Sequence, residues 1–167
     1  MKVLVIGPSG SGKSYLADAL QAKGINAFDD EDIDGLSSWY NQRWQKIPPP
    51  KTADEAFSNH YSFLWDKKFL ADFLDGHDEV YIFGGSGNVM DVFDLFDKVY
   101  FLKISLELQK ERLRSPLRKT PALDFGEKGQ IIWGAWFEDE ARKRNVPFVD
   151  ADQTPEEIFE IISRRNS

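Results

Sequence analysis

Short apolar runs alternate with longer amphipathic stretches along this chain. The first run, Val3–Ile6, is continuously apolar and rich in β-branched residues, a pattern typical of a strand that is buried on both faces of a parallel sheet. The predicted strands are Val3–Ile6, Ile25–Phe28, Val80–Phe83, Val99–Ile104 and Val146–Val149. Strands that alternate with helical stretches predict a doubly wound α/β sheet with helices on both faces.

The intervening stretches show helical periodicity and recognisable helix ends. Glycine and proline are expected to end two of the helices, and Thr154-Pro155-Glu156-Glu157 is a capping box that opens the last one. The polar stretch 29–50 predicts a loop with one short helix around Ser37–Trp44. The remaining predicted helices are Lys13–Lys23, Asp54–Leu74, one from Ser105 to Pro116, and Gln130–Arg144.

The composition is that of a single globular domain. The chain has 167 residues, of which 41% are hydrophobic and 29% charged, and its formal charge is −7. It shows no basic patch for nucleic acid, no cysteine for a disulfide or thiolate metal site, and no apolar run near the roughly 20 residues of a membrane span. We therefore expect a cytoplasmic domain over residues 1–167 that binds neither nucleic acid nor membrane.

The strongest motif follows the first predicted strand. Residues 7–14 fit the pattern G-x-x-x-x-G-K-[ST], between a buried strand and a helix. Its glycines let successive backbone N–H groups turn inward as an anion nest, and the helix adds its positive end. The alternative is a glycine-rich turn that only reverses the chain. The predicted nucleotide-binding residues here are Gly7, Pro8, Ser9, Gly10, Ser11, Gly12, Lys13, Ser14 and Tyr15, with Lys13 on the β- and γ-phosphates and Ser14 on Mg²⁺.

This loop occurs in kinases, GTPases and motor ATPases, so other residues must decide the reaction. The chain has no Asn-Lys-x-Asp motif of the kind that GTPases use, and the strand Val80–Phe83 ends in glycine rather than in an acid. We therefore expect the carboxylate partner of Mg²⁺ to come from the acidic stretch after the second strand. Asp30 would hold the metal and Asp32 would orient or deprotonate an acceptor hydroxyl, with both facing one pocket. A solvated acidic turn is the alternative.

Two further segments are candidates for an acceptor site. The stretch Ser37–Trp44 is unusually aromatic, so Trp39 could stack on a ring and Arg43 could hold an anion. A satellite hydrophobic cluster explains the same residues equally well. Gly84 and Gly85 follow a core strand, where the absence of side chains would let a ligand approach the backbone, unless they form only a tight turn.

Positive charge gathers at Arg112, Arg114, Arg118 and Lys119 in an otherwise acidic chain. Arginines on a closing loop would stabilise charge on a transferred phosphoryl group while excluding water. Ordinary enrichment of cations in the last turn of a helix accounts for Arg112 and Arg114, but less well for the other two. We expect a lid over about residues 115–129.

The order of these features resembles the small P-loop kinases, including the adenylate, shikimate and gluconate kinases. The resemblance implies a three-layer P-loop NTPase fold, with a five-stranded parallel sheet of order 2-3-1-4-5 and an acceptor-side insertion at about residues 31–75. It also implies that Arg112 packs against adenine, that Arg118 contacts the transferred phosphate, and that the loop Asp150–Pro155 edges the adenine site.

A closer resemblance is to a family of bacterial kinase-like proteins, known mainly as nucleotide-kinase-like or AAA-type ATPases. It depends on Asp30-x-Asp32-x-Asp34-Gly35-Leu36-x-x-Trp39, on Trp65-Asp66 and on Asp124-Phe125-Gly126. The chain departs from shikimate kinases in having Arg114-Ser115-Pro116-Leu117 where they have an Arg-Pro-Leu-Leu lid, and from adenylate kinases in its short region between the second and third strands.

Together these features predict an ATP- and Mg²⁺-dependent kinase for a small metabolite or a nucleoside or nucleotide, acting as a monomer or weak homodimer. Lys13, Asp32 and Arg118 would be catalytic, Ser14 and Asp30 would bind the metal, and the substrate would contact Asp32, Trp39, Arg43, Gly84 and Gly85. The alternative is a nucleotide-binding or ATP-hydrolysing module that signals to a protein partner through the aromatic loop around Trp39 and Trp44.

Overall fold

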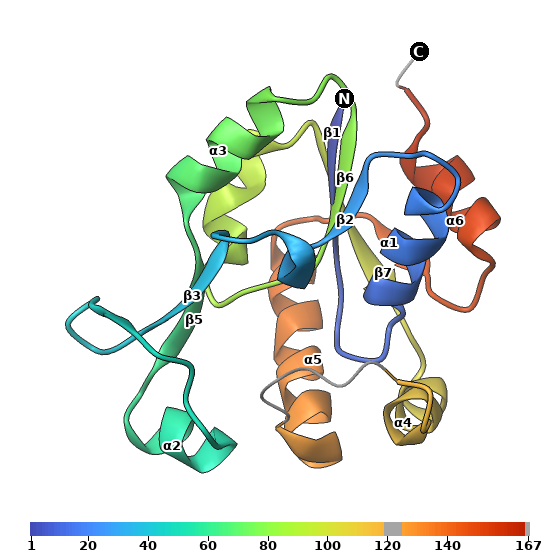
Figure 1. The fold of residues 1–167 in the computed structure, drawn as a ribbon. Helices are drawn as coiled ribbons and strands as arrows, with labels where there is room; N and C mark the ends of the chain where they lie inside the picture. The colour runs from blue at the N-terminus through green and yellow to red at the C-terminus, as the bar shows by residue number, and fades with distance from the viewer. Residues whose placement is uncertain (119–124, 166–167) are drawn as a thin grey trace.

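The computed structural model describes residues 1–118 and 125–165, which form a parallel five-stranded sheet covered by helices on both faces (Figure 1). The sheet has the order β2-β6-β1-β7-β8. In chain order of the parallel strands this is 2-3-1-4-5, so the predicted fold class and strand order are confirmed. The strands are β1 (Lys2–Ile6), β2 (Ala27–Asp29), β6 (Val80–Phe83), β7 (Lys98–Lys103) and β8 (Phe148–Asp150).

The central strand β1 divides the core into two layers. Val3 and Val5 pack with α1 (Lys13–Gln21) and α6 (Pro155–Ile162), whereas Leu4 and Ile6 pack with α3 (Lys67–Asp75) and α5 (Gly126–Lys143). This alternation follows from the pleat, which sends successive side chains to opposite faces. Figure 1 shows α1 and α6 on one side of the sheet and α3 and α5 on the other.

Most predicted helices are present with small shifts at their ends. The predicted capping box is confirmed at α6, where Thr154 accepts from the backbone of Glu157 and the Glu157 carboxylate accepts from the backbone of Thr154. The remaining elements around the sheet are α4 (Leu106–Arg114) and two 3₁₀ helices, η1 (Asp30–Asp32) and η2 (Val89–Leu95). Among the described residues, none of the helices is both long enough and apolar enough to cross a membrane.

The largest difference from the sequence prediction lies at residues 37–65, which we call the arm. The prediction of a short helix around Ser37–Trp44 is wrong, because these residues form a strand and a turn. The continuous helix expected over Asp54–Leu74 is also wrong, because it is interrupted by a strand. The arm consists of β3 (Ser37–Tyr40), β4 (Lys46–Ile47), α2 (Ala53–Ser58) and β5 (Ser62–Trp65), and its strands form an antiparallel sheet of order β4-β3-β5.

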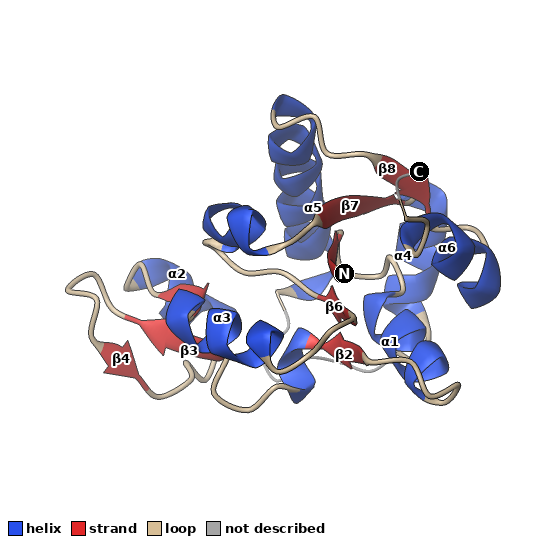
Figure 2. Cartoon of the chain, turned by 90° about the horizontal axis from the view of Figure 1, so that it is seen from above, coloured by secondary structure: helices blue, strands red, loops and turns tan. Residues whose placement is uncertain are grey.

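Aromatic spacing misled the helix prediction. Phe57, Tyr61 and Leu64 are spaced as on one face of a helix, but the helix stops at Ser58 and His60 adopts a positive φ of 53°. After that turn the residues alternate between the two faces of a strand. Figures 1 and 2 show the arm extending to one side of the parallel sheet.

The glycine-rich turn after β6 attaches the arm to the parallel sheet. Gly87 N donates to Phe63 O at 2.9 Å, which pairs the outer edge of β5. The Asn88 side chain continues this edge, because it accepts from Trp65 N at 2.9 Å and donates to Trp65 O at 2.9 Å. The arm is therefore held at the carboxyl end of β6, beside the predicted phosphate loop.

Candidate active site

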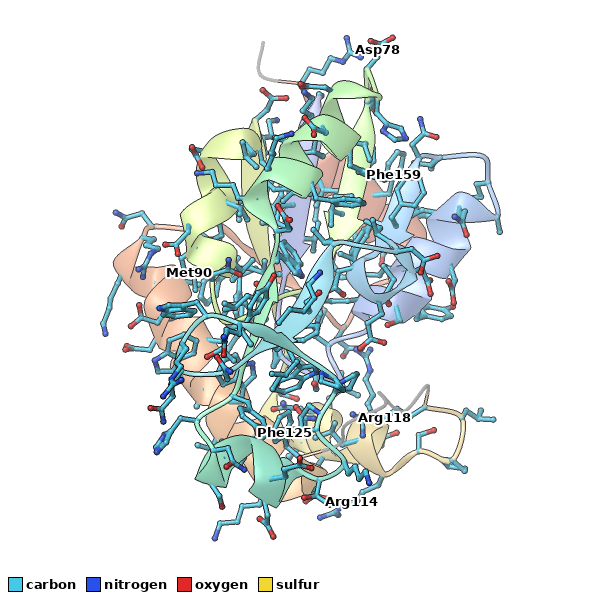
Figure 3. The ribbon with its side chains drawn as sticks, turned by 60° about the vertical axis from the view of Figure 1, so that its left-hand side comes forward. Asp78, Met90, Arg114, Arg118, Phe125 and Phe159 are labelled. Carbon is cyan, nitrogen blue, oxygen red and sulfur yellow. The ribbon has the colours of Figure 1, made fainter. Side chains whose placement is uncertain are left out.

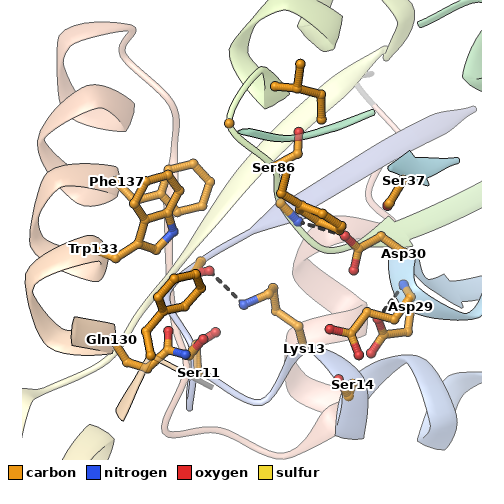
Figure 4. Close-up of a pocket in the computed structure, with 18 of the residues that line it drawn as sticks. Ser11, Lys13, Ser14, Asp29, Asp30, Ser37, Ser86, Gln130, Trp133 and Phe137 are labelled. Atoms are coloured by element: carbon orange, nitrogen blue, oxygen red, sulfur yellow. Dashed lines mark hydrogen bonds between the residues drawn. The ribbon is translucent and has the colours of Figure 1, made fainter. Parts of the chain in front are cut away.

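A cavity of about 1710 Å³ lies at the carboxyl ends of β1, β2 and β6, where the strand order places the phosphate loop, the arm and α5 around one space. In open parallel sheets this is the edge at which ligands bind. Figure 4 shows Gln130 and Trp133 of α5 on one side of the cavity, Lys13 near its centre, and Asp29 and Asp30 on the other side.

The phosphate loop has the backbone shape that its sequence predicts. Gly10 and Gly12 adopt φ values of 84° and 97°, a region that suits glycine, and α1 begins at the next residue, Lys13. Lys13 Nζ donates to Gly7 O at 2.7 Å and to Pro8 O at 3.0 Å. The ammonium group is thus held in the loop, where it satisfies two carbonyl groups.

Helix α4 fixes the loop from behind. Arg112 donates to Ser11 O at 3.0 Å and to Ala151 O at 3.3 Å, and so links the phosphate loop to the segment between β8 and α6. Buried Gln109 donates to Ser9 O at 3.1 Å. The sequence prediction missed Gln109, since a single glutamine in a highly charged helix carries no distinctive pattern.

Three consecutive acidic residues, Asp29, Asp30 and Glu31, line the cavity. The expected pair was Asp30 and Asp32. Asp29 and Asp30 are buried. Glu31 and Asp32 are both exposed, but only Glu31 lines the cavity. The expected alternation of Asp30 and Asp32 requires an extended chain, but η1 begins at Asp30. Residues two apart in a 3₁₀ helix point in different directions, so the structure corrects the prediction that both carboxylates face one pocket.

Asp30 is tightly enclosed and links three segments. Its Oδ2 accepts from Trp65 Nε1 at 3.2 Å and from Gly85 N at 3.4 Å. A Cβ on Gly84 would lie 2.2 Å from Asp30 Cγ, so only glycine fits at that position. Gly85 lines the cavity as predicted, but Gly84 does not, and its role here is to make room for the Asp30 side chain.

Burial disfavours the charged forms of both Asp30 and Lys13. It raises the pKa of Asp30 well above the ordinary value, and the neighbouring Asp29 carboxyl raises it further, while Lys13 opposes the rise. Burial likewise lowers the pKa of Lys13, and the Asp30, Asp29 and Glu31 carboxylates oppose that change. The phosphate loop lysine and the acidic segment are therefore close enough to influence each other electrically.

Three buried polar atoms of residues that line the cavity lack a hydrogen-bond partner among the described residues: Ser11 Oγ, Asp29 Oδ2 and Ser37 Oγ. Such atoms are costly to bury unless a ligand or water satisfies them. A hydroxyl in the anion nest suits a phosphate oxygen. The Asp29 carboxylate and the Ser14 hydroxyl are hard oxygen donors at the same cavity, which suits Mg²⁺ because that ion binds through one or two protein oxygens together with phosphates and water.

The predicted nucleotide and acceptor residues separate into two groups. Those that line the cavity are Gly7, Ser9 through Tyr15, Arg112, Arg118, Asp30, Trp39 and Gly85. Those that do not are Pro8, Asp32, Arg43, Gly84 and Pro155. Arg43 lies exposed in the turn between β3 and β4, Pro8 packs against the Gly134 position of α5, and Pro155 is the first residue of α6.

The predicted lid is described only at its two ends, because residues 119–124 lie outside the described part of the chain, Lys119 and Asp124 among them. Arg114 and Glu127 form a two-pronged ion pair, with distances of 2.6 and 2.7 Å, between the end of α4 and the start of α5. Phe125 contacts Phe57 of the arm, with ring centroids 5.3 Å apart. Figure 3 shows Arg118 and Phe125 at the end of the molecule where α2 lies.

No protein-family model matches this sequence, and no curated protein matches it. Solved structures do. A gluconokinase from Sinorhizobium meliloti 1021 is 20% identical, with 95% of this chain and 87% of that chain covered and a TM-score of 0.52. A shikimate kinase from Acinetobacter baumannii in complex with shikimate is 14% identical, with 96% and 92% covered and a TM-score of 0.55. A deoxyadenosine kinase from M. mycoides is 17% identical, with 98% and 96% covered and a TM-score of 0.51.

These structures are all small P-loop kinases, and the chain has their fold over nearly its whole length. The predicted resemblance is confirmed at this level. Identities of 14% to 20% show the shared fold alone, and the names gluconokinase, shikimate kinase and deoxyadenosine kinase describe those proteins.

Because Asp30 is tightly enclosed, we expect alanine to destabilise the protein at Gly84 but not at the adjacent Gly85. Gly84→Ala should lower the free energy of unfolding by roughly 1–3 kcal/mol, because its Cβ would overlap the Asp30 side chain. Gly85→Ala is the matched control, since its Cβ would meet the Phe137 ring at an ordinary 3.4 Å. Urea unfolding of both variants measures the difference, and equal stabilities would contradict the packing described for Asp30.

Proposed function

We propose that the protein is an ATP- and Mg²⁺-dependent phosphotransferase that acts on a hydroxyl group of a small molecule. The observation that carries this proposal is the shared cavity, which has the phosphate loop on one side and the aromatic arm on the other, with the carboxylates of residues 29–31 between them. A site for nucleotide hydrolysis alone has no need of a second compartment of this kind.

On the donor side, the loop amides and Lys13 bind the β- and γ-phosphates. Lys13 exchanges its bonds to the carbonyls of Gly7 and Pro8 for phosphate oxygens as the nucleotide enters. Arg112 keeps the loop in shape through Ser11 and Ala151. Its guanidinium and the cavity-lining residues Ala151 and Gln153 border the position that we assign to adenine.

Mg²⁺, when bound, neutralises charge on the β- and γ-phosphates. Ser14 and one carboxylate would hold it. We assign that carboxylate to Asp29 rather than to Asp30, because Asp29 Oδ2 is buried at the cavity with no hydrogen-bond partner in the described chain, whereas Asp30 Oδ2 already accepts two hydrogen bonds.

In the transfer, the bond between the γ-phosphorus and the β–γ bridging oxygen breaks, and a bond forms between the γ-phosphorus and the acceptor hydroxyl oxygen. ADP leaves with the electron pair of the broken bond. Glu31 orients the hydroxyl and takes its proton, the role first expected of Asp32, since Glu31 borders the cavity and Asp32 does not. Arg118 compensates charge on the transferred group.

The donor side is tested by Lys13→Ala. This variant should remain folded but lose most of the rise in Tm that Mg²⁺ and ATP give to the unaltered protein, because stabilisation by a ligand grows with its concentration relative to Kd. Differential scanning fluorimetry measures the rise. Lys68→Ala, which removes an exposed lysine of α3 outside the cavity, is the control. An unchanged rise for Lys13→Ala would refute the phosphate-loop assignment.

Substitutions in the acidic segment test two assignments, Glu31 as the proton acceptor and Asp29 as the carboxylate that holds Mg²⁺. Glu31→Gln should lower kcat by about 10²–10⁴-fold through loss of the proton acceptor, and Asp29→Asn should raise the Mg²⁺ concentration needed for half-maximal rate. Asp72→Asn, on the outer side of α3, is the control. Loss of turnover in Asp32→Asn with full turnover in Glu31→Gln would return the acceptor role to Asp32.

Transfer itself is tested by following ATP consumption with pooled small-molecule extracts. A kinase shows turnover stimulated by one fraction and a phosphorylated product in that fraction. Tight ATP binding with no stimulation by any fraction would instead favour a nucleotide-binding or hydrolysing module that signals to a protein partner.

A further inference from the structure

The arm presents an apolar surface to the cavity. Trp39 lies directly opposite Phe63 of β5 and Ile47 of β4, so all three side chains share one face of the antiparallel sheet. The Trp39 and Phe63 ring centroids are 5.4 Å apart, and all three residues line the cavity. We call these three residues the aromatic platform. The two rings are inclined by 50°, so a planar ring can stack on Trp39 while its edge meets Phe63.

A buried hydroxyl accompanies the platform. Ser37 lies two residues before Trp39 on the same strand and therefore on the same face. Its Oγ is buried at the cavity and has no hydrogen-bond partner among the described residues. It can serve the polar edge of a ring that stacks on Trp39. From α5, Trp133 faces the same cavity and is 45% exposed (Figure 4).

The charged side chains that line this half of the cavity are mainly carboxylates. Besides Asp29 and Glu31, the exposed carboxylates Asp34 and Asp91 border it. Lys46 is the cation of the arm that lines the cavity, although it pairs with Tyr40, one position from Trp39, and so starts from the opposite face of the sheet. In the described part of the chain, no arginine of the arm lines the cavity.

The other cations that line the cavity among the described residues are Lys13, Arg112 and Arg118, and they belong to the donor side. Lys13 lies in the phosphate loop, and Arg112 is bound to the carbonyls of Ser11 and Ala151. Arg118 follows α4 and lies near enough to Lys13 to lower the pKa of that lysine. An acceptor that already carried a phosphate or a carboxylate would have to lose its water beside carboxylates, with no arginine fork from the arm to replace that water.

We propose that the acceptor is an uncharged or positively charged hydroxyl compound with a planar ring, and that within the nucleosides and nucleotides the site takes the nucleoside and rejects its 5′-monophosphate. The ring stacks on the aromatic platform, Ser37 binds its polar edge, and the carboxylate row excludes anions. This proposal deepens the proposed function and rests on it, since it names the class of acceptor for the same cavity.

Binding is measured apart from turnover, so that the two proposals can fail separately. The full-length protein is saturated with Mg²⁺ and a non-hydrolysable ATP analogue and titrated with four common nucleosides and their 5′-monophosphates, with Tm and tryptophan fluorescence as readouts. At least one nucleoside should bind at least 10-fold more tightly than its monophosphate. Tighter binding of the monophosphate, or no binding by any nucleoside, overturns the acceptor class. Nucleoside binding with no phosphorylated product when ATP is supplied would leave the acceptor class standing and overturn the kinase.

Two sets of variants test separately the stacking of the ring on Trp39 and the exclusion of anions by the carboxylates. Trp39→Ala should weaken nucleoside binding at least 10-fold, whereas Trp39→Phe should largely keep it. Trp136→Ala is the matched control, because Trp136 is 43% exposed on α5 but does not line the cavity. Asp34→Asn combined with Asp91→Asn should narrow the gap between nucleoside and monophosphate at least threefold, and more at low salt, since screening weakens exposed charges. An unaltered gap would show that these carboxylates do not select the acceptor.

Discussion

The turn from β1 into α1 is the constraint on which the rest of the structure depends. β1 is buried on both faces, so its chain direction is fixed by two packed layers. The loop that follows must then turn its amides inward, reverse direction and start a helix within a few residues, which the positive φ values of Gly10 and Gly12 allow. Lys13, Gln109 and Arg112 bind four carbonyls from Gly7 to Ser11, so the anion nest is held in place from both sides.

Local patterns were sufficient to predict the parallel sheet and the loop. Each of the five strands falls in a short, mainly apolar run, and the phosphate loop is defined by residue types at fixed spacing, so neither depends on distant contacts. The arm could not be predicted in this way. Its strands are short and mixed in composition, and β5 depends on pairing with β3 and with the turn at Gly87 and Asn88, which lies more than 20 residues further along the chain.

The site was predicted unevenly for the same reason. Lys13 and Ser14 follow from the motif, but which carboxylates reach the cavity depends on where the chain stops being extended. β2 ends at Asp29 and η1 begins at Asp30, and this single step exchanges the expected Asp32 for Glu31 at the cavity. Gly84 was recognised as a position that needs no side chain, although the group that occupies the space is Asp30 of the protein itself rather than a ligand.

The outer strand of the arm also bears on how the protein behaves at high concentration. β4 is an edge strand of only two residues, followed at once by Pro48, Pro49 and Pro50. Prolines offer no N–H group to a neighbouring strand, and short edges give little surface for pairing. The arm is thereby protected from adding a strand of another molecule to its sheet, and it can keep its aromatic residues at an open cavity without inviting aggregation.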